Sequence, residues 1–241
     1  EGQLFILFWD ATHFDYSWPK EENSPFKPFA NEFAYFRAIQ SQKNLDLIKN
    51  RYRNAVHFVD HLFGQFLEKL PNKEEAIVVV TGDHGEEFFE HGHLFHGSHL
   101  TQEQIHIPLY FKLGEKGPKI DPERIISQVD LFPTLLDYIG GEAPDYLQGE
   151  SLLRQAKKGF TLTSRFNAGR TPEQLSLHNG HHKLIANFLY DKEPLQATGL
   201  HVVSLRKGDD SPLPDSKEQI KEWTHHEFQG AFETLFPPRA P

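Results

Sequence analysis

Acidic and imidazole side chains gather directly after one apolar run of the sequence. The run is Ile77–Val80, and Asp83 and His84 follow it, with a glycine on either side of the pair. A carboxylate and an imidazole are both ligands for divalent transition metals. The residues that come next continue this pattern, with Glu86, Glu87, Glu90, His91, His93, His96 and His99.

Two interpretations of these residues must be compared. Surface loops are often rich in Glu and His, so any single residue from 86 to 93 can be an ordinary solvated side chain. Asp83 and His84 differ, because Gly82 and Gly85 let the backbone approach a bound group closely. The uninterrupted β-branched run before them is typical of a strand buried on both faces, and open α/β sheets bind ligands at the carboxyl ends of such strands. We therefore predict metal or phosphate-type chemistry at Asp83 and His84.

The order of these motifs resembles a known family signature. Residues 81–87 (TGDHGEE), 94–97 (LFHG) and 104–109 (QIHIPL) are similar to the C-terminal signature of the sulfatase branch of the alkaline phosphatase superfamily. That branch includes sulfatases, phosphonate hydrolases, and membrane-anchored phosphoethanolamine and phosphoglycerol transferases. The resemblance implies a metal-dependent hydrolase or transferase that acts on sulfate or phosphate esters, with lipids and glycans as candidate substrates.

The resemblance also implies a role for particular residues. Asp83 and His84 would bind the metal, and Glu86 would support these two ligands without binding the metal itself. His96 would be catalytic and would contact the substrate, by donating to the leaving-group oxygen or to a non-bridging oxygen. His99 would contact the substrate as well. His13 would be a second catalytic and substrate-binding imidazole, because it resembles the family's Thr/Ser-His-x-Pro-Tyr element, although Asp15 stands where Pro is usual.

The ligand types favour certain metals and certain reactions. An imidazole is a softer donor than an amide oxygen, so an Asp and His pair favours zinc or manganese over calcium. We therefore expect phosphate or phosphonate ester chemistry somewhat ahead of sulfate ester hydrolysis. A different class of function is also compatible with the sequence, namely a non-catalytic sulfatase-like domain that binds lipid or acts as a sensor at the inner membrane.

Elements that would position these residues can be predicted from periodicity. Apolar runs predict strands at Leu4–Trp9 and Ile107–Leu113, in addition to the run before Asp83. Apolar residues three and four apart predict helices at Asn44–Leu70 and Ile125–Ile139. A strand, a helix and a strand in this order indicate a crossover unit with parallel strands. The fold class predicted is α/β, a three-layer α/β/α arrangement with a mostly parallel, alkaline-phosphatase-like sheet.

After Gly159 the sequence changes to short strands separated by turns. We expect strands at 160–163, 174–177, 183–188 and 200–205, with a hairpin turn at Asn179-Gly180. A final helix at Ser216–Leu235 would complete a small antiparallel sheet plus helix. The predicted domains are 1–155, the C-terminal portion of the catalytic domain, and 156–241, the small subdomain.

Composition restricts the possible partners. The 241 residues carry a net charge of −9, which argues against a nucleic-acid partner. There is no Cys, so no thiolate metal site is possible, and no apolar run is long enough to span a membrane. The chain starts at Glu1 and contains no Met, and it lacks the family's Cys/Ser-x-Pro-x-Arg nucleophile motif. We expect a fragment, inactive on its own, whose nucleophile and membrane anchor precede Glu1. By analogy, the domain would lie on the periplasmic or other extracytoplasmic side of the inner membrane.

Overall fold

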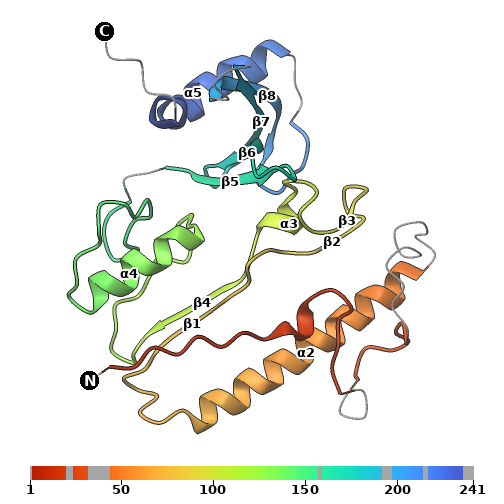
Figure 1. Cartoon of the computed structure of the whole chain (residues 1–241), viewed down its shortest axis with the longest axis vertical. Coiled ribbons are helices and arrows are strands. Elements are labelled where there is room, and N and C mark those ends of the chain that lie inside the picture. The colour runs from red at the N-terminus through yellow and green to blue at the C-terminus, as the bar shows by residue number, and fades with distance from the viewer. Residues whose placement is uncertain are drawn as a thin grey trace. The chain divides into compact units, whose positions relative to one another are not determined.

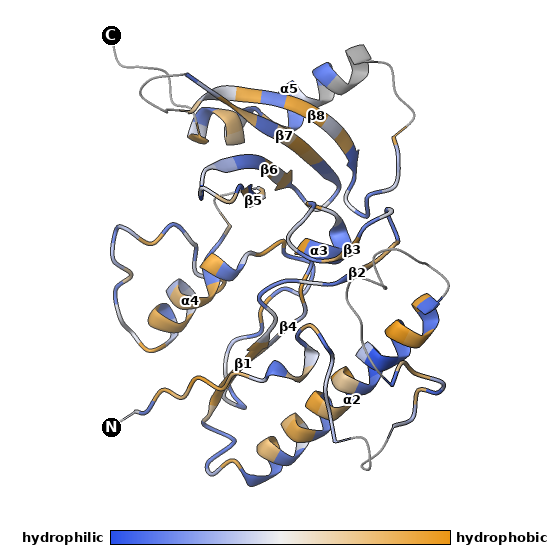
Figure 2. Cartoon of the chain, turned by 45° about the vertical axis from the view of Figure 1, so that its right-hand side comes forward, coloured by the Kyte–Doolittle hydropathy of each residue, from blue (hydrophilic) through white to orange (hydrophobic). Residues whose placement is uncertain are grey.

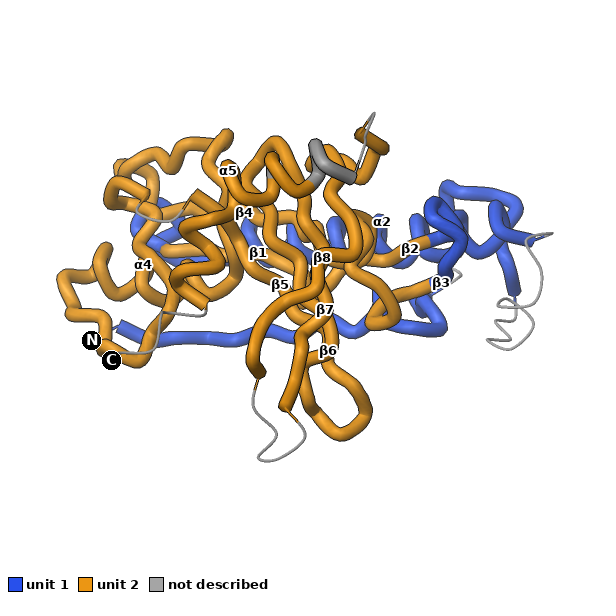
Figure 3. The backbone as a smooth tube through the Cα atoms, turned by 90° about the horizontal axis from the view of Figure 1, so that it is seen from above, with its two compact units in different colours: residues 1–76, 88–94 blue, residues 77–87, 95–241 orange. Residues whose placement is uncertain are grey.

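The computed structural model describes residues 2–19, 24–31, 44–156, 159–191, 197–213 and 217–235. They divide into two compact units, coloured separately in Figure 3. Unit 1 comprises residues 1–76 and 88–94, and unit 2 comprises residues 77–87 and 95–241. The predicted domain boundary after residue 155 falls inside unit 2 and stays a prediction.

Unit 1 is built on one long helix, α2 (Leu45–Lys69), which confirms the helix predicted there. Hydrophobic and hydrophilic residues alternate along it with helical spacing (Figure 2). Asn44 occupies the N-cap position, but its side chain makes no capping hydrogen bond. The helix ends before Pro71, as the sequence indicates.

Two polar residues of α2 are buried rather than solvated. The Arg51 guanidinium donates to the backbone oxygens of Asp15 (2.7 Å) and Ala30 (2.8 Å). The Asn54 side chain donates to Phe26 O and accepts from Phe26 N–H, both at 3.0 Å. These bonds satisfy backbone groups of Asp15, Phe26 and Ala30. The helix α2 therefore holds the segment that precedes it through hydrogen bonds from its own polar side chains.

The N-terminal segment differs from the prediction. Leu4–Trp9 is extended but forms no strand, and residues 4–8 of this segment are exposed. An extended segment becomes a strand only when a neighbouring strand completes its backbone hydrogen bonds, and none does so among the described residues. The 3-10 helix η1 (Asp10–Thr12) follows it (Figure 1). The buried strand predicted here was therefore wrong.

In unit 2, β1 (Ile77–Thr81) pairs with β4 (Leu109–Leu113) in antiparallel register, Ile77 opposite Leu113 and Thr81 opposite Leu109. The parallel crossover predicted between these segments is not found, because β1 and β4 are antiparallel, as are the paired strands of the C-terminal sheet. Only Val78 of β1 is buried, and its other residues are half-buried or exposed. β4 begins after Pro108, because proline has no N–H to donate to a strand ladder. Short elements lie in the intervening chain, namely β2 (Glu87–Phe88), β3 (Leu94–Phe95) and α3 (Gln102–Ile105).

The second predicted helix is shorter than expected. The 3-10 helix η3 (Gln128–Asp130) leads into α4 (Leu131–Tyr138), and residues 125–127 precede both. The Asp130 carboxylate accepts N–H groups from Ser127 (2.8 Å) and Glu150 (2.7 Å). The sequence predicts that Asp130 caps this helix rather than acting in catalysis. Asp130 does occupy the N-cap position of α4, but its side chain completes a capping box with Ser127 at η3 and makes no capping hydrogen bond into α4. None of the helices that the structure describes has the length and apolar character needed to cross a bilayer.

The C-terminal part of unit 2 confirms the small antiparallel sheet. Its strands follow one another in the sheet in chain order and pair with their neighbours in antiparallel register. Gly180, in the turn between the second and third of these strands, has a φ of +93°, which suits the predicted hairpin. Helix α5 (Lys217–Leu235) follows the sheet. The sequence also predicts that Phe33 anchors the loop before α2, that Trp223 packs inward from the last helix and that Pro237-Pro238 ends this helix, but Phe33, the Trp223 side chain and both prolines lie outside the described residues. The strands are β5 (Thr161–Phe166), β6 (Pro172–His178), β7 (His182–Tyr190) and β8 (Ala197–Lys207).

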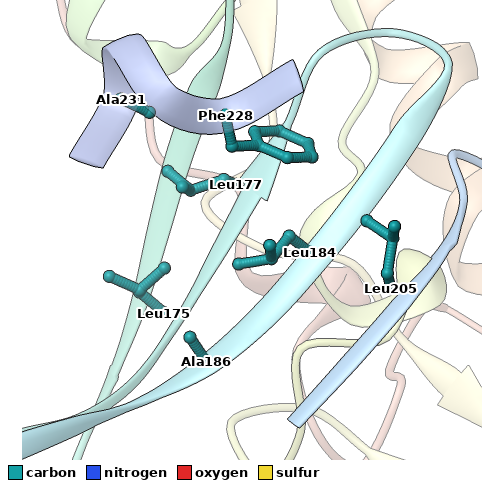
Figure 4. Close-up of a cluster of buried hydrophobic side chains, with 7 residues drawn as sticks. All are labelled: Leu175, Leu177, Leu184, Ala186, Leu205, Phe228 and Ala231. Atoms are coloured by element: carbon teal, nitrogen blue, oxygen red, sulfur yellow. The ribbon is translucent and has the colours of Figure 1, made fainter. Parts of the chain in front are cut away.

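One face of this sheet packs against α5. Phe228 and Ala231 of α5 lie over the leucines of the sheet (Figure 4). Burial of such a cluster is the main favourable contribution to folding of this part of the chain. The buried members on the sheet are Leu175, Leu177, Leu184, Ala186 and Leu205.

A buried ion pair connects this sheet to the loop before α3. The Lys183 ammonium of β7 is fully buried, forms an ion pair with Asp210, and donates to Leu100 O at 3.0 Å. The Asp210 carboxylate also accepts the Gln102 N–H. Burial lowers the pKa of Lys183, although the adjacent Asp210 carboxylate acts in the opposite direction. The pair therefore holds residues 100–102 against the sheet.

We predict that Lys183→Met lowers the free energy of unfolding by about 3–5 kcal/mol, because it leaves the Asp210 carboxylate buried without its cation. Urea unfolding followed by circular dichroism would measure the change. Arg154→Gln is the control, since its ion pair with Asp137 is exposed on the arginine side. An equal loss in both variants would contradict the special position of Lys183.

His178, at the end of β6, is held by both ring nitrogens. Its Nε2 donates to Gly208 O at 3.1 Å, and its Nδ1 accepts the Gly180 N–H at 3.1 Å. The sequence predicted a solvated hairpin histidine, but the side chain is half-buried. Burial lowers the pKa of His178, and the nearby positive charges of Lys183 and His106 act in the same direction. Gly208 O and the Asp210 carboxylate oppose the shift.

This lowered pKa predicts a pH-dependent stability. The unfolded imidazole binds a proton near pH 6.5, whereas the folded one binds it only at lower pH. The contribution of His178 is therefore complete above about pH 6.5 and is lost as pH falls below that value. Unfolding free energies measured from pH 8 to pH 5 should fall less steeply for His178→Gln than for the unmodified chain. Identical slopes would contradict the interpretation.

Candidate active site

The predicted metal pair lies in the turn that follows β1. The Asp83 Oδ1 accepts the His84 N–H at 3.0 Å and lies 3.6 Å from the Nε2 of His84. The Asp83 side chain is 78% exposed and that of His84 is 35% exposed. Two potential metal-binding atoms are therefore close together on side chains that solvent can reach.

The hydrogen bonds of His84 determine which ring nitrogen can bind a metal. Its Nδ1 lies 3.0 Å from Gly85 O, and a carbonyl can only accept, so Nδ1 carries the proton. The lone pair of the neutral ring is then on Nε2, the atom nearest Asp83. This pairing of one ring N–H with a carbonyl is the usual arrangement behind a histidine ligand. The donors that are present therefore fit a divalent metal such as zinc or manganese.

His96 lies directly beside His84. The two imidazole rings stack, with their centroids 3.6 Å apart and their planes at 25°. The Nδ1 of His96 is 3.2 Å from Oε1 of Glu86, whose side chain is only 5% exposed. The hydrogen bond that the His96 ring donates to the Glu86 carboxylate raises the pKa of His96. Burial opposes this shift, and the negative charges of Glu86 and Asp83 add to it. The residue that Glu86 orients is therefore His96, and not Asp83 or His84.

A buried glutamine fixes the loop that carries these histidines. The Oε1 of Gln104 accepts the N–H groups of Ser98 (3.2 Å) and His99 (3.1 Å). Its Nε2 donates to the Glu87 carboxylate at 2.8 Å, and that carboxylate also accepts the Thr101 hydroxyl at 2.7 Å. Gln104 and Glu87 are both almost inaccessible to solvent. The loop from 96 to 101 is thus held by a satisfied buried network.

A cavity of about 780 Å³ opens in unit 2 beside the metal pair. Asp83, His84 and His99 line it. Its remaining walls come from the chain around α3, from the segment before α4, and from strands β5 and β6. The ligand pair therefore faces a space large enough for a small organic substrate.

The structure brings together most of the residues predicted for the site. Asp83, His84, Glu86 and His96 form one cluster, and His99 lines the same cavity as the first two. His13 belongs to unit 1, where it follows η1 with its side chain 55% exposed and its Nδ1 3.9 Å from Asp10. The catalytic and substrate-binding role of His13 stays a prediction.

Sequence reasoning missed the residues that hold the loop. Gln104 and Glu87 looked like ordinary members of a polar stretch, because burial of a polar side chain leaves no mark in composition. Lys183 was predicted only as the first residue of the strand at 183–188, and its partner Asp210 lies in a turn. A buried Lys needs a partner, and this requirement is the one signal that could have linked them.

The fold matches solved structures of related proteins. A TM-score of 0.58 relates the chain to BT4656, a structure described as a complex with its substrate D-glucosamine-2-N,6-O-disulfate. The match covers 82% of this chain and 43% of that one, with 19% sequence identity. The fold is therefore that of the sulfatases. The predicted α/β, alkaline-phosphatase-like class is confirmed, whereas the parallel pairing within it is not.

Sequence comparison agrees with the fold. The sulfatase family model matches residues 1–141, so the chain belongs to the sulfatase family. It is 32% identical to mouse arylsulfatase K over 114 residues, which are 47% of this chain and 20% of that protein. It is 30% identical over 107 residues to the multifunctional alkaline phosphatase superfamily protein PehA of Trinickia caryophylli, covering 42% of this chain and 21% of PehA. The chain thus spans about a fifth of the length of these relatives.

We predict that Gly85→Ala disturbs the site, because an added Cβ would lie 2.1 Å from Glu103 O. The backbone at Gly85, which donates to Gln104 O at 2.9 Å, would have to move. A two-dimensional NMR spectrum should show shifts throughout residues 83–106, together with lower thermal stability.

Gly64→Ala is the matched control for this variant. Gly64 lies within α2, where an added methyl meets nothing within 4 Å, and alanine favours a helix by about 0.5–1 kcal/mol over glycine. The control should be as stable as the unmodified chain or more stable. An unperturbed spectrum for Gly85→Ala would contradict the close approach at that position.

Proposed function

We propose that this chain forms part of a metal-dependent hydrolase of sulfate esters, with Asp83 and His84 among the metal ligands. The observation that carries the proposal is the 3.6 Å separation of Asp83 Oδ1 and His84 Nε2 at the edge of a cavity. Membership of the sulfatase family supports the reaction class. A bound divalent metal would supply charge that stabilises the oxygens of the ester and lowers the pKa of a nucleophile.

The other residues of the cluster would orient groups and hold protons. Glu86 fixes the ring of His96 through Nδ1, so His96 would present its Nε2–H to an oxygen of the substrate. His99, whose backbone is fixed by Gln104, would hydrogen-bond to the substrate from the cavity wall. A nucleophile and further metal ligands would be needed to complete this site.

Phosphate or phosphonate monoesters are the second candidate substrates. The imidazole donor of His84 favours them, because it suits zinc or manganese better than calcium. The similarity to PehA, a multifunctional member of the alkaline phosphatase superfamily, supports this alternative. Membrane attachment, a lipid substrate, an extracytoplasmic location and the non-catalytic sensor role stay predictions from the sequence.

Metal binding by the chain provides a direct test. We predict that Mn²⁺ broadens the NMR signals of residues 83–86 and of the His96 ring first, because paramagnetic broadening falls steeply with distance from the ion. His84→Gln and Asp83→Asn should each weaken Mn²⁺ binding by about tenfold or more. The first variant removes the imidazole ligand, and the second removes the negatively charged carboxylate ligand.

His61→Gln is the control for this titration. His61 lies on α2, where its Nε2 contacts Gln65 at 3.0 Å, and it has no predicted role. This variant should retain the same broadening pattern around residue 84. If broadening appeared elsewhere and was unaffected by both ligand variants, the metal assignment would be wrong.

A further inference from the structure

The two faces of the C-terminal sheet differ in chemistry. In the β5–β6 register, Leu162 lies opposite Leu177 on the face that packs against α5. Thr163 lies opposite Ser176, and Thr161 lies opposite His178, so these residues share the other face. A sheet face turned toward the interior of a unit is normally apolar. This one is polar, and the part of it on β5 and β6 that lines the cavity consists of Thr161, Thr163, Arg165, Ser176 and His178.

Two polar atoms on this face have no partner among the described residues. Ser176 is 1% exposed, and its hydroxyl makes no hydrogen bond. The Nε of Arg165 is also buried without a partner, while Nη1 of the same guanidinium lies 2.9 Å from Glu173. Buried polar groups without partners are costly, so they are retained in proteins mainly where a ligand or water satisfies them. Both atoms belong to residues that line the same cavity as Asp83, His84 and His99.

The donors and acceptors on the face restrict what would bind there. Hydroxyl groups of Thr and Ser both donate and accept, which matches the hydroxyl groups of a sugar. The Arg165 guanidinium only donates and carries a charge, which matches a sulfate or carboxylate. An aryl ester or an acyl chain would leave Ser176 and Arg165 unsatisfied.

We propose that this polar face binds the sugar part of the substrate, and that Arg165 binds a second anionic group on that sugar. The inference rests on the proposed function, because it assigns the ester to Asp83 and His84 and the rest of the substrate to β5 and β6. Ser176 accepts or donates one hydrogen bond to a ring hydroxyl. Arg165 is then the residue that distinguishes a sugar with two anionic groups from a sugar with one.

The test measures binding of three probes to the full 241-residue chain, in the presence of Mn²⁺, by isothermal titration calorimetry and NMR. The probes are 4-nitrophenyl sulfate, D-glucosamine 6-O-sulfate and D-glucosamine 2-N,6-O-disulfate. We expect the disulfate to bind about tenfold more tightly than the monosulfate, as a charge-assisted hydrogen bond would provide. Arg165→Gln should remove this preference and leave the affinity for 4-nitrophenyl sulfate unchanged.

Glu173→Gln is the matched control, because it breaks the same ion pair and leaves the Arg165 charge in place. It should keep the preference for the disulfate. Ser176→Ala should weaken both sugar probes about threefold to tenfold and leave 4-nitrophenyl sulfate unchanged. Circular dichroism of each variant establishes that it is folded.

The possible failures can be distinguished. If Arg165→Gln and Glu173→Gln had the same effect on the three probes, Arg165 would be only a structural ion-pair residue and the inference would be overturned. The inference would also be overturned if the sugars bound no more tightly than 4-nitrophenyl sulfate. If Asp83→Asn still weakened binding of all three probes, the proposed function would stand without the inference. If none of the probes bound, the proposed function would fail together with the inference.

Discussion

The loop that carries the predicted histidines depends on a buried charge pair contributed by distant parts of the chain. Lys183 and Asp210 lie in the C-terminal sheet and the turn after it, yet they bind Leu100 O and Gln102 N–H in the loop. A charge pair removed from water is stable only when its remaining hydrogen bonds are also made, and here the backbone of the loop makes them. The position of residues 100–102 is therefore defined by β7 and not by local turn preferences.

The network around Gln104 extends this constraint to the site. Gln104 holds Ser98 and His99, and Gly85 approaches Glu103 so closely that only glycine fits there. A helix of only four residues, α3, supplies both contacts. The turn with Asp83 and His84 and the loop with His96 are thus fixed against the same short element. This shared support brings the rings of His84 and His96 into their stacked arrangement.

Much of this arrangement could be predicted from the sequence, because the strongest signals were local. The α2 helix, the four C-terminal strands, the Asn179-Gly180 turn and the candidate metal pair all follow from periodicity, turn residues and motif spacing. The errors concern pairing between segments. Leu4–Trp9 has the composition of a buried strand, but composition cannot supply the neighbour that makes a strand, and β1 pairs with β4 in antiparallel register instead. The buried roles of Arg51, Gln104 and Lys183 depend on contacts across the chain, so a helical or strand period could not reveal them.

The exposed apolar segment Leu4–Phe8 has a consequence for the behaviour of the chain in solution. It has no charge and no proline, and its backbone groups form no ladder with the described strands. Segments of this kind readily add to the edge of a sheet in another molecule. Self-association of the chain through this short stretch, which is remote in sequence from the candidate site, should therefore increase as the protein is concentrated.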